Sequence, residues 1–279
     1  MSRGPHDHRF ALPVAGPEKA VSAAATTYAD PGLGSGTSYS YRVRATDAAG
    51  NLSGYSGAAS ATTAAAPSVI AFVQVAAATP QSAQTSVAVK YMAAQSAGNL
   101  NVVVVGWNDS TAAVTSVVDS AGNTYVKAVG PTSVTGTLTQ SIYYASNIAA
   151  AAAGVNTVTV RFSQAAQYVD IRILEYGGLD PTNPVDATAA ATGTSRAADS
   201  GAATTTNAND LIFGAATTTT RAKAGAGFTS RIVTKPDEDL AEDKVVSATG
   251  SYRATASISP SGAWVMQMVA FKAAGIPGT

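Results

Sequence analysis

The stretch "GNLNVVVVGWND" (Gly98–Asp109) places turn-forming residues directly before a run of valines. Valine favours an extended backbone because its branched side chain packs well on a pleated surface, and Gly98 with Asn99 is typical of the turn before a strand. The stretch therefore predicts a strand over Val102–Val105. Comparable segments recur along the chain, at "VIAFVQVAAA", "LTQSIYYASNI", "VNTVTVRFS", "YVDIRILEYGGL", "NDLIFGAAT", "GFTSRIVT", "DKVVSATGSY", "ATASIS" and "AWVMQMVAFKA".

The predicted strands number roughly eleven over residues 69–273, with turn residues between them and no amphipathic helix. Many short antiparallel strands of this kind pack as a sandwich. The expected fold class is therefore all-β, with a larger antiparallel jelly-roll-like β-sandwich. Within it, a hairpin is predicted with Asp119–Asn123 at its tip. Tyr143 and Tyr144 are adjacent, so one is expected to face inward and the other outward.

Composition excludes several classes of function. Charged residues make up 12% of the chain, and Lys+Arg and Asp+Glu number 17 each. Because this neutral balance gives no electrostatic footprint for a polyanion, no nucleic-acid partner is expected. Cysteine is absent, which excludes disulfides and zinc–thiolate sites. The chain lacks a run of about 18 apolar residues, so membrane insertion is not expected.

An apolar–polar alternation begins at Tyr39 and Tyr41, within "GTSYSYRVRATDAAGNLSGYS" (residues 36–56), and is typical of a half-buried strand. The turn formers of "TDAAGN" follow it, and Leu33 lies six residues before Tyr39. These residues resemble the C-terminal half of a fibronectin type III domain, over about residues 20–63. In that family a Leu and a Tyr form the tyrosine corner between the fifth and sixth strands.

The first half of such a domain is missing, and a half sandwich leaves an apolar face and open strand edges uncovered. Residues 1–19 show no alternation, so we expect an irregular leader that is not native to the module. Residues 64–68 are interpreted as a linker and residues 274–279 as a tail. The chain is expected to be a fragment of a longer modular protein. The alternative is that residues 1–35 cover the exposed face by an irregular route.

Five segments stand out in the larger domain, namely "GNLNVVVVGW", "VVDSAGNTY", "DIRILEYGGLD", "NANDLIFG" and "TGSYRATASISPSGAWVMQMVAFKA". Together they resemble a β-sandwich module that recurs in large bacterial surface or secreted proteins, often beside fibronectin type III repeats. The resemblance implies an extracellular, non-catalytic module and brings no catalytic or ligand residues with it. The start of the chain has no apolar segment of signal-peptide length. We therefore expect the export signal upstream of this chain, and the protein outside the cell or at its surface.

Catalytic chemistry has few candidate groups. Both histidines lie in the leader, so the larger domain offers no imidazole for a catalytic triad, a general base or a transition metal. Asp170 and Glu175 are five positions apart on one predicted strand and point to opposite faces, which does not suit a glycosidase acid pair. For Glu175, a buried ion pair with Arg172 or Arg161 is favoured over a catalytic acid. We predict that the chain is not an enzyme and needs no cofactor.

One segment, "KPDEDLAEDK", concentrates acidic residues. Oxygen ligands clustered in a loop suit Ca²⁺, which accepts irregular geometry, although the spacing is not that of an EF-hand. Lys235 and Lys244 flank the cluster and partly neutralise it. A solvated acidic loop is favoured over a calcium site. The candidate ligands are Asp237, Glu238, Asp239, Glu242 and Asp243.

Trp107 lies at a predicted strand end beside Asn108 and Asp109. A planar aromatic with polar neighbours is a candidate platform for a sugar ring, and these three residues form the candidate glycan site. The alternative is that Trp107 caps the sandwich core, as Trp264 is expected to do from inside the last strand.

The leading hypothesis is a structural or adhesive module of a secreted or cell-surface bacterial multidomain protein. The first alternative is a carbohydrate-binding accessory module of a polysaccharide-degrading enzyme. The second is a self-associating surface or filament subunit that pairs its open strand edge with another chain. The partners expected are accordingly a glycan, other surface proteins, or a second copy.

Overall fold

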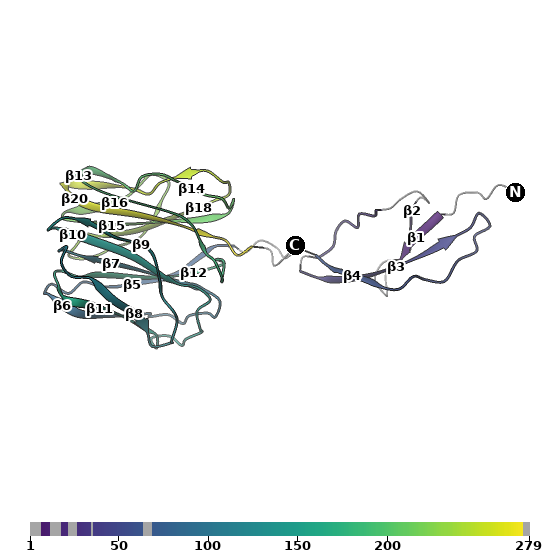
Figure 1. Ribbon diagram of the computed structural model, residues 1–279, viewed down its shortest axis with the longest axis horizontal. Helices are drawn as coiled ribbons and strands as arrows, with labels where there is room; N and C mark the ends of the chain where they lie inside the picture. Colours follow the sequence, from purple (N-terminus) through teal and green to yellow (C-terminus); the bar gives the residue numbers. More distant parts are fainter. Residues whose placement is uncertain (1–6, 12–17, 22–26, 35, 64–68, 276–279) are drawn as a thin grey trace. The chain divides into compact units, whose positions relative to one another are not determined.

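The structure is a computed structural model, and it describes residues 7–11, 18–21, 27–34, 36–63 and 69–275 (Figure 1). The chain divides into two compact units, Met1–Pro67 with Ile276–Thr279 and Ser68–Gly275. The described residues form strands, turns and loops without a helix, which confirms the all-β prediction. In this part of the chain no helix has the length and apolar character needed to cross a membrane.

The smaller unit contains a four-stranded antiparallel sheet in the order β2-β1-β3-β4. The prediction of an irregular leader is therefore wrong for residues 7–11 and 18–19, which belong to β1 and β2, whereas its remaining residues and the predicted linker over 64–68 lie outside the described residues. Backbone groups make the ladder, so a segment without side-chain alternation can still extend a sheet. Among residues 27–34 and 36–63, Thr46 alone is buried. The strands are β1 (Asp7–Ala11), β2 (Glu18–Val21), β3 (Ser38–Thr46) and β4 (Ala59–Thr62).

Two local contacts shape the ends of β3. The Tyr39 hydroxyl accepts a hydrogen bond from the Gly34 backbone N–H at 2.9 Å, which is the kind of contact a tyrosine corner makes. At the other end, the Asp47 carboxylate accepts from the backbone N–H of Asn51 at 2.8 Å. Gly50 has φ 87° in this turn, a conformation that glycine adopts without steric strain. The predicted turn after the strand is therefore present.

The larger unit stacks three sheets (Figure 1). The middle sheet has the order β5-β12-β7-β10-β9, one outer sheet has the order β6-β11-β8, and the other has the order β13-β20-β15-β18-β17, with β16 also paired to β20. The middle strands are β5 (Ala71–Ala78), β7 (Leu100–Trp107), β9 (Val126–Val134), β10 (Leu138–Ala145) and β12 (Asp170–Gly177).

The first outer sheet consists of β6 (Gln84–Lys90), β8 (Val114–Asp119) and β11 (Thr157–Ala166). The second contains β13 (Val185–Asp199), β15 (Asp210–Thr218), β16 (Arg221–Ala224), β17 (Thr229–Val233), β18 (Leu240–Val246) and β20 (Thr255–Lys272). Two short strands, β14 (Ala203–Thr204) and β19 (Ser251–Tyr252), pair separately.

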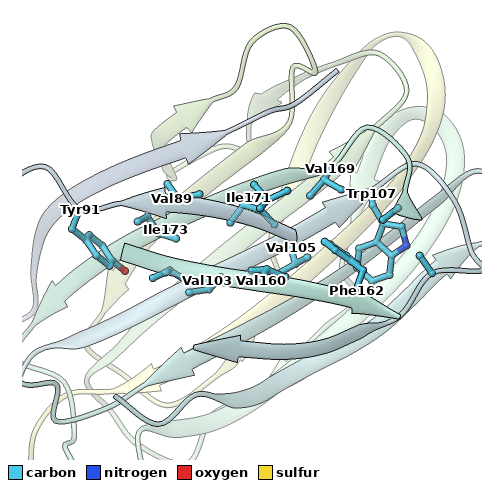
Figure 2. Close-up of a cluster of buried hydrophobic side chains, with 14 residues drawn as sticks. Val89, Tyr91, Val103, Val105, Trp107, Val160, Phe162, Val169, Ile171 and Ile173 are labelled. Atoms are coloured by element: carbon cyan, nitrogen blue, oxygen red, sulfur yellow. The ribbon is translucent and has the colours of Figure 1, made fainter. Parts of the chain in front are cut away.

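The central strands of the middle sheet, β7 and β12, are buried on both faces. All eight residues of β7 are buried, because Val103 and Val105 face the three-stranded sheet (Figure 2) while Val102 and Val104 face the β13–β20 side. This explains the uninterrupted valine run, since a strand with two covered faces needs no polar alternation. A jelly roll has two facing sheets, whereas this sandwich has three.

A third core lies on the outer face of the last sheet. β20 is 18 residues long, and its pairing with β13 shifts between Ser195 and Ala197. Beyond the shift, the far ends of β13 and β20 fold over this face together with β16. Ile258 there packs in one cluster with Met266 and Met268.

Two local predictions fail because the middle sheet has a layer on each side. The segment around Asp119–Asn123 is no hairpin, since β8 pairs with β11 whereas β9 pairs with β10 in another sheet. The segment therefore crosses between layers. Likewise, Tyr143 packs against the first core and Tyr144 against the second. The prediction that one of the two tyrosines faces inward and the other outward assumed a sandwich of two sheets. In this structure each tyrosine packs against a core cluster, on opposite faces of β10.

Candidate functional site

Trp107 is only 1% exposed. Its ring packs edge-to-face on Phe162 of β11, with ring centroids 5.6 Å apart (Figure 2). Neighbouring strands flank the end of β7 on both sides, through the pairs Thr139↔Trp107 and Asp170↔Gly106. The prediction that the Trp107 ring is an exposed platform for stacking on a sugar is therefore wrong, because the ring caps the core instead. Trp264 is also buried, as expected.

Asn108 and Asp109 begin the loop after β7. The backbone N–H of Asn108 donates to the carbonyl of Gln167 at 2.7 Å. The Asp109 carboxylate accepts backbone hydrogen bonds from Thr111 and Ala112, both at 2.8 Å, and from Gln167 at 2.9 Å. Partial burial alone would raise the pKa of Asp109, but these three N–H groups hold the pKa below its ordinary value. Asp109 thus fixes the loop rather than facing a ligand.

A pocket of about 270 Å³ opens beside this loop. Its floor is β10, one wall is β9, and the other is the loop with the start of β8. Strands in a sheet lie about 4.8 Å apart, so a three-stranded sheet leaves roughly two strand widths of a five-stranded one uncovered. The three-stranded sheet has its β6 edge against β5, which leaves the β10–β9 side open. The pocket is lined by Trp107, Ser110, Thr111, Ala112, Ala113, Val114, Lys127, Pro131, Ser133, Thr139, Ser141 and Tyr143.

Polar and apolar groups share the inner surface of the pocket in similar proportion. The Thr139 hydroxyl donates to the Asp109 carbonyl at 2.6 Å and lies 3.0 Å from Ser133 Oγ. Burial raises the pKa of Tyr143 above its ordinary value. The Trp107 indole N–H is buried and has no acceptor among the described residues. A buried donor without a partner is uncommon in folded proteins.

The acids of "KPDEDLAEDK" do not form a solvated loop. Asp239, Glu242 and Asp243 are buried, because the segment continues into β18. Glu242 and Asp243 are consecutive on that strand and so point to opposite faces. The described residues include no group of three or more His, Cys, Asp or Glu placed to hold a metal ion. The prediction of a solvated loop is therefore wrong for these three acids.

Each acid of the cluster has its own partner. Asp243 binds Arg231 through two hydrogen bonds of 2.7 and 2.9 Å. Glu238 pairs with Arg221, whose Nε lies 3.0 Å away, and with Lys235. The remaining partners are the Gln81 amide for Asp237, the Thr218 backbone N–H for Asp239, and the Gly225 backbone N–H for Glu242. Because these partners lie on separate elements, the carboxylates do not share one centre.

A buried ion-pair network joins the middle sheet to the β13–β20 side. Arg172 of β12 is fully buried; its Nε lies 2.8 Å from an Asp170 oxygen and its Nη2 lies 3.6 Å from an Asp239 oxygen. Its Nη1 donates to the carbonyls of Ala216 and Leu240 at 3.0 and 2.7 Å. Burial and the nearby Asp170 raise the pKa of Asp239, and Arg172 opposes that rise. The guanidinium therefore connects three strands.

Glu175 occupies the opposite face of β12, as its spacing from Asp170 predicted. Its oxygens accept hydrogen bonds from Gln74 Nε2 at 2.6 Å and from Asn99 Nδ2 at 2.7 Å. The predicted ion pair with Arg172 or Arg161 is therefore wrong. The buried carboxyl group accepts hydrogen bonds from side-chain amides instead.

Comparison with known proteins gives one short likeness. A stretch of 38 residues is 63% identical to part of the "Alpha-amylase" of Niallia circulans, which amounts to 14% of this chain and 3% of that protein. No family model and no solved structure matches the chain.

Proposed function

We propose that the chain is a non-catalytic β-sandwich module of a secreted or cell-surface multidomain protein, and that its larger unit is a rigid scaffold. The observation that carries this proposal is the Arg172 network. The buried carboxyl groups of Asp170 and Asp239 are both engaged by one guanidinium, that of Arg172. A carboxyl group held in this way is buried and oriented by the fold, and it lacks access to a substrate.

The test is a hydrolysis assay on the full chain. Soluble starch, xylan and chromogenic glycosides are incubated with the protein at pH 5, 7 and 8, and released reducing ends are measured. We expect no turnover above a heat-denatured control. Turnover that disappears in Asp170→Asn or Glu175→Gln, with the variant still folded by circular dichroism, would contradict the proposal.

A carbohydrate-binding accessory module is the second candidate function. The likeness to a segment of an α-amylase favours it, as does the open pocket lined by hydroxyl groups. Sedimentation with insoluble starch, cellulose and chitin tests it. We expect the chain to co-sediment with one of these matrices and to be released by the corresponding soluble sugar; equal recovery in every supernatant would count against it.

We propose further that residues 20–63 are the C-terminal half of a fibronectin type III domain acting as a spacer. The hydrogen bond between Gly34 and the Tyr39 hydroxyl supports this assignment. So does the single buried residue, Thr46, among residues 27–34 and 36–63, because a half domain lacks the opposing sheet. Extending the chain upstream with a complementary half domain is expected to raise the melting temperature of this unit. An unchanged melting temperature would count against the assignment.

A further inference from the structure

The pocket over β9 and β10 has the size and position of a site for a small ligand. Sites for drug-sized ligands occupy about 300–1,000 Å³, so a pocket of about 270 Å³ accommodates roughly one ring. The uncovered part of the middle sheet forms its floor, and this floor is rigid because β10 is paired on both sides, with β7 and β9. The site is therefore preformed.

The lining selects a neutral, hydroxylated ligand. Thr139, Ser141 and Tyr143 alternate along β10 and present their hydroxyl-bearing side chains to the pocket, and Ser133 adds another from β9. Hydroxyl groups both donate and accept, so they match a polyol. Lys127 is the one charged residue among the lining residues, which is too little positive charge for a phosphate-rich ligand.

The Trp107 indole provides an independent observation. Its N–H is buried without an acceptor among the described residues, whereas Trp264 donates the corresponding N–H to Ser195 Oγ at 3.0 Å. Trp107 lines the pocket, and Figure 2 shows its nitrogen on the side of the ring away from Phe162. An unpaired buried donor costs about 1–3 kcal/mol, and a ligand oxygen in the pocket would satisfy it.

We propose that this pocket binds a single sugar unit of a glycan, with Trp107 donating to a sugar oxygen and the hydroxyl groups of β10 contacting the remaining polar atoms. This inference rests on the carbohydrate-binding function proposed above, and it names the site. The apolar surfaces of Pro131 and Val114, which also line the pocket, suit the C–H face of a sugar ring.

Indole NMR signals test the proposal on the intact chain. The sequence contains two tryptophans, so a ¹⁵N-labelled sample has two indole N–H peaks, which Trp264→Phe assigns. Titration with glucose, maltose, cellobiose and N-acetylglucosamine is expected to move the Trp107 peak saturably with at least one sugar and to leave the Trp264 peak in place. Movement of the Trp264 peak alone, or of neither peak, would overturn the proposal.

A variant that fills the pocket tests whether polysaccharide binding takes place there. Ser133 is exposed on β9, so Ser133→Tyr fills the pocket from its rim without entering the core. Thr188→Tyr, at an exposed position of β13, is the matched control. We expect Ser133→Tyr to weaken polysaccharide binding at least tenfold and Thr188→Tyr to leave it unchanged. If Ser133→Tyr binds polysaccharide as well as the unsubstituted chain, the pocket is not the binding site, although the chain still binds carbohydrate. If the unsubstituted chain does not bind, both the pocket site and the carbohydrate-binding function are overturned.

Discussion

Glu242 makes the stability of the larger unit depend on pH. It is fully buried on β18; one carboxylate oxygen accepts from the Gly225 N–H at 2.8 Å, and the other has no partner among the described residues. Burial raises the pKa of Glu242 to about 7 from an ordinary value of 4.5, although the Gly225 N–H and Lys244 oppose the rise. The folded state therefore prefers the neutral acid.

The direction and size of the effect follow from linkage. Because the folded-state pKa exceeds the unfolded value, the folded state binds more protons between pH 4.5 and pH 7, so the free energy of unfolding falls as pH rises through that window. At about 1.36 kcal/mol for each pH unit, the loss from this group is about 3 kcal/mol. Glu242→Gln removes the ionisation, so the variant is expected to lose this part of the pH dependence.

Urea unfolding followed by tryptophan fluorescence measures the effect. Both tryptophans lie in the larger unit, so the signal reports that unit alone. Glu238→Gln is the control: its ion pairs with Lys235 and Arg221 lower the pKa of Glu238, so that variant keeps the slope above pH 4.5. Parallel pH profiles for Glu242→Gln and the unsubstituted protein would refute the reasoning.

Three further substitutions test the interior. Burial raises the pKa of Asp210 to about 6 from 3.8, so Asp210→Asn should remove a fall in unfolding free energy of about 3 kcal/mol between pH 3.8 and pH 6; unchanged pH dependence in urea titrations would contradict this. Arg172→Met leaves the buried Asp170 and Asp239 without their cationic partner and is expected to destabilise by about 3–5 kcal/mol, whereas exposed Arg161→Met should have little effect; equal midpoints would count against the network. Trp107→Ala is expected to cost about 3–5 kcal/mol in calorimetry, and a cost as small as that of exposed Val118→Ala would show that Trp107 is not part of the core.

Strands with a strong hydrophobic or β-branched signal could be predicted from sequence, and β13 could not. In β13 the inward positions hold Ala187, Ala189 and Ala191, and threonines occupy outward positions such as 188 and 192. This alternation has little hydrophobic contrast, so it gives a weak strand signal.

The number of layers and the surroundings of the candidate site residues could not be predicted from sequence, because they depend on contacts between distant segments. The valine run of β7 indicates burial, but it does not show that a separate sheet covers each face. Trp107 is at a strand end, yet β10 and β12 extend beside it and enclose the ring. Similarly, Glu242 and Asp243 look solvated in sequence because the groups that bind them, Gly225 and Arg231, come from other elements.

The sequence carries a signal for the pocket in the side chains of β10. In "LTQSIYYA" the positions of Thr139, Ser141 and Tyr143 alternate with apolar Leu138 and Ile142 and with Gln140. This pattern gives β10 one face that bears hydroxyl groups, and such a face is expected where a sheet is only partly covered. The position of the covering sheet was needed to see which strands remained open.

Amide hydrogen exchange measured residue by residue tests whether the larger unit is a rigid scaffold whose central strands, β7 and β12, are covered on both faces. The account predicts that the amides of β7, β10 and β12 exchange only through global unfolding, with protection equal to the free energy measured by urea, while edge strands such as β6 and β17 exchange faster. Protection in β7 no greater than in β6 would contradict the three-layer account.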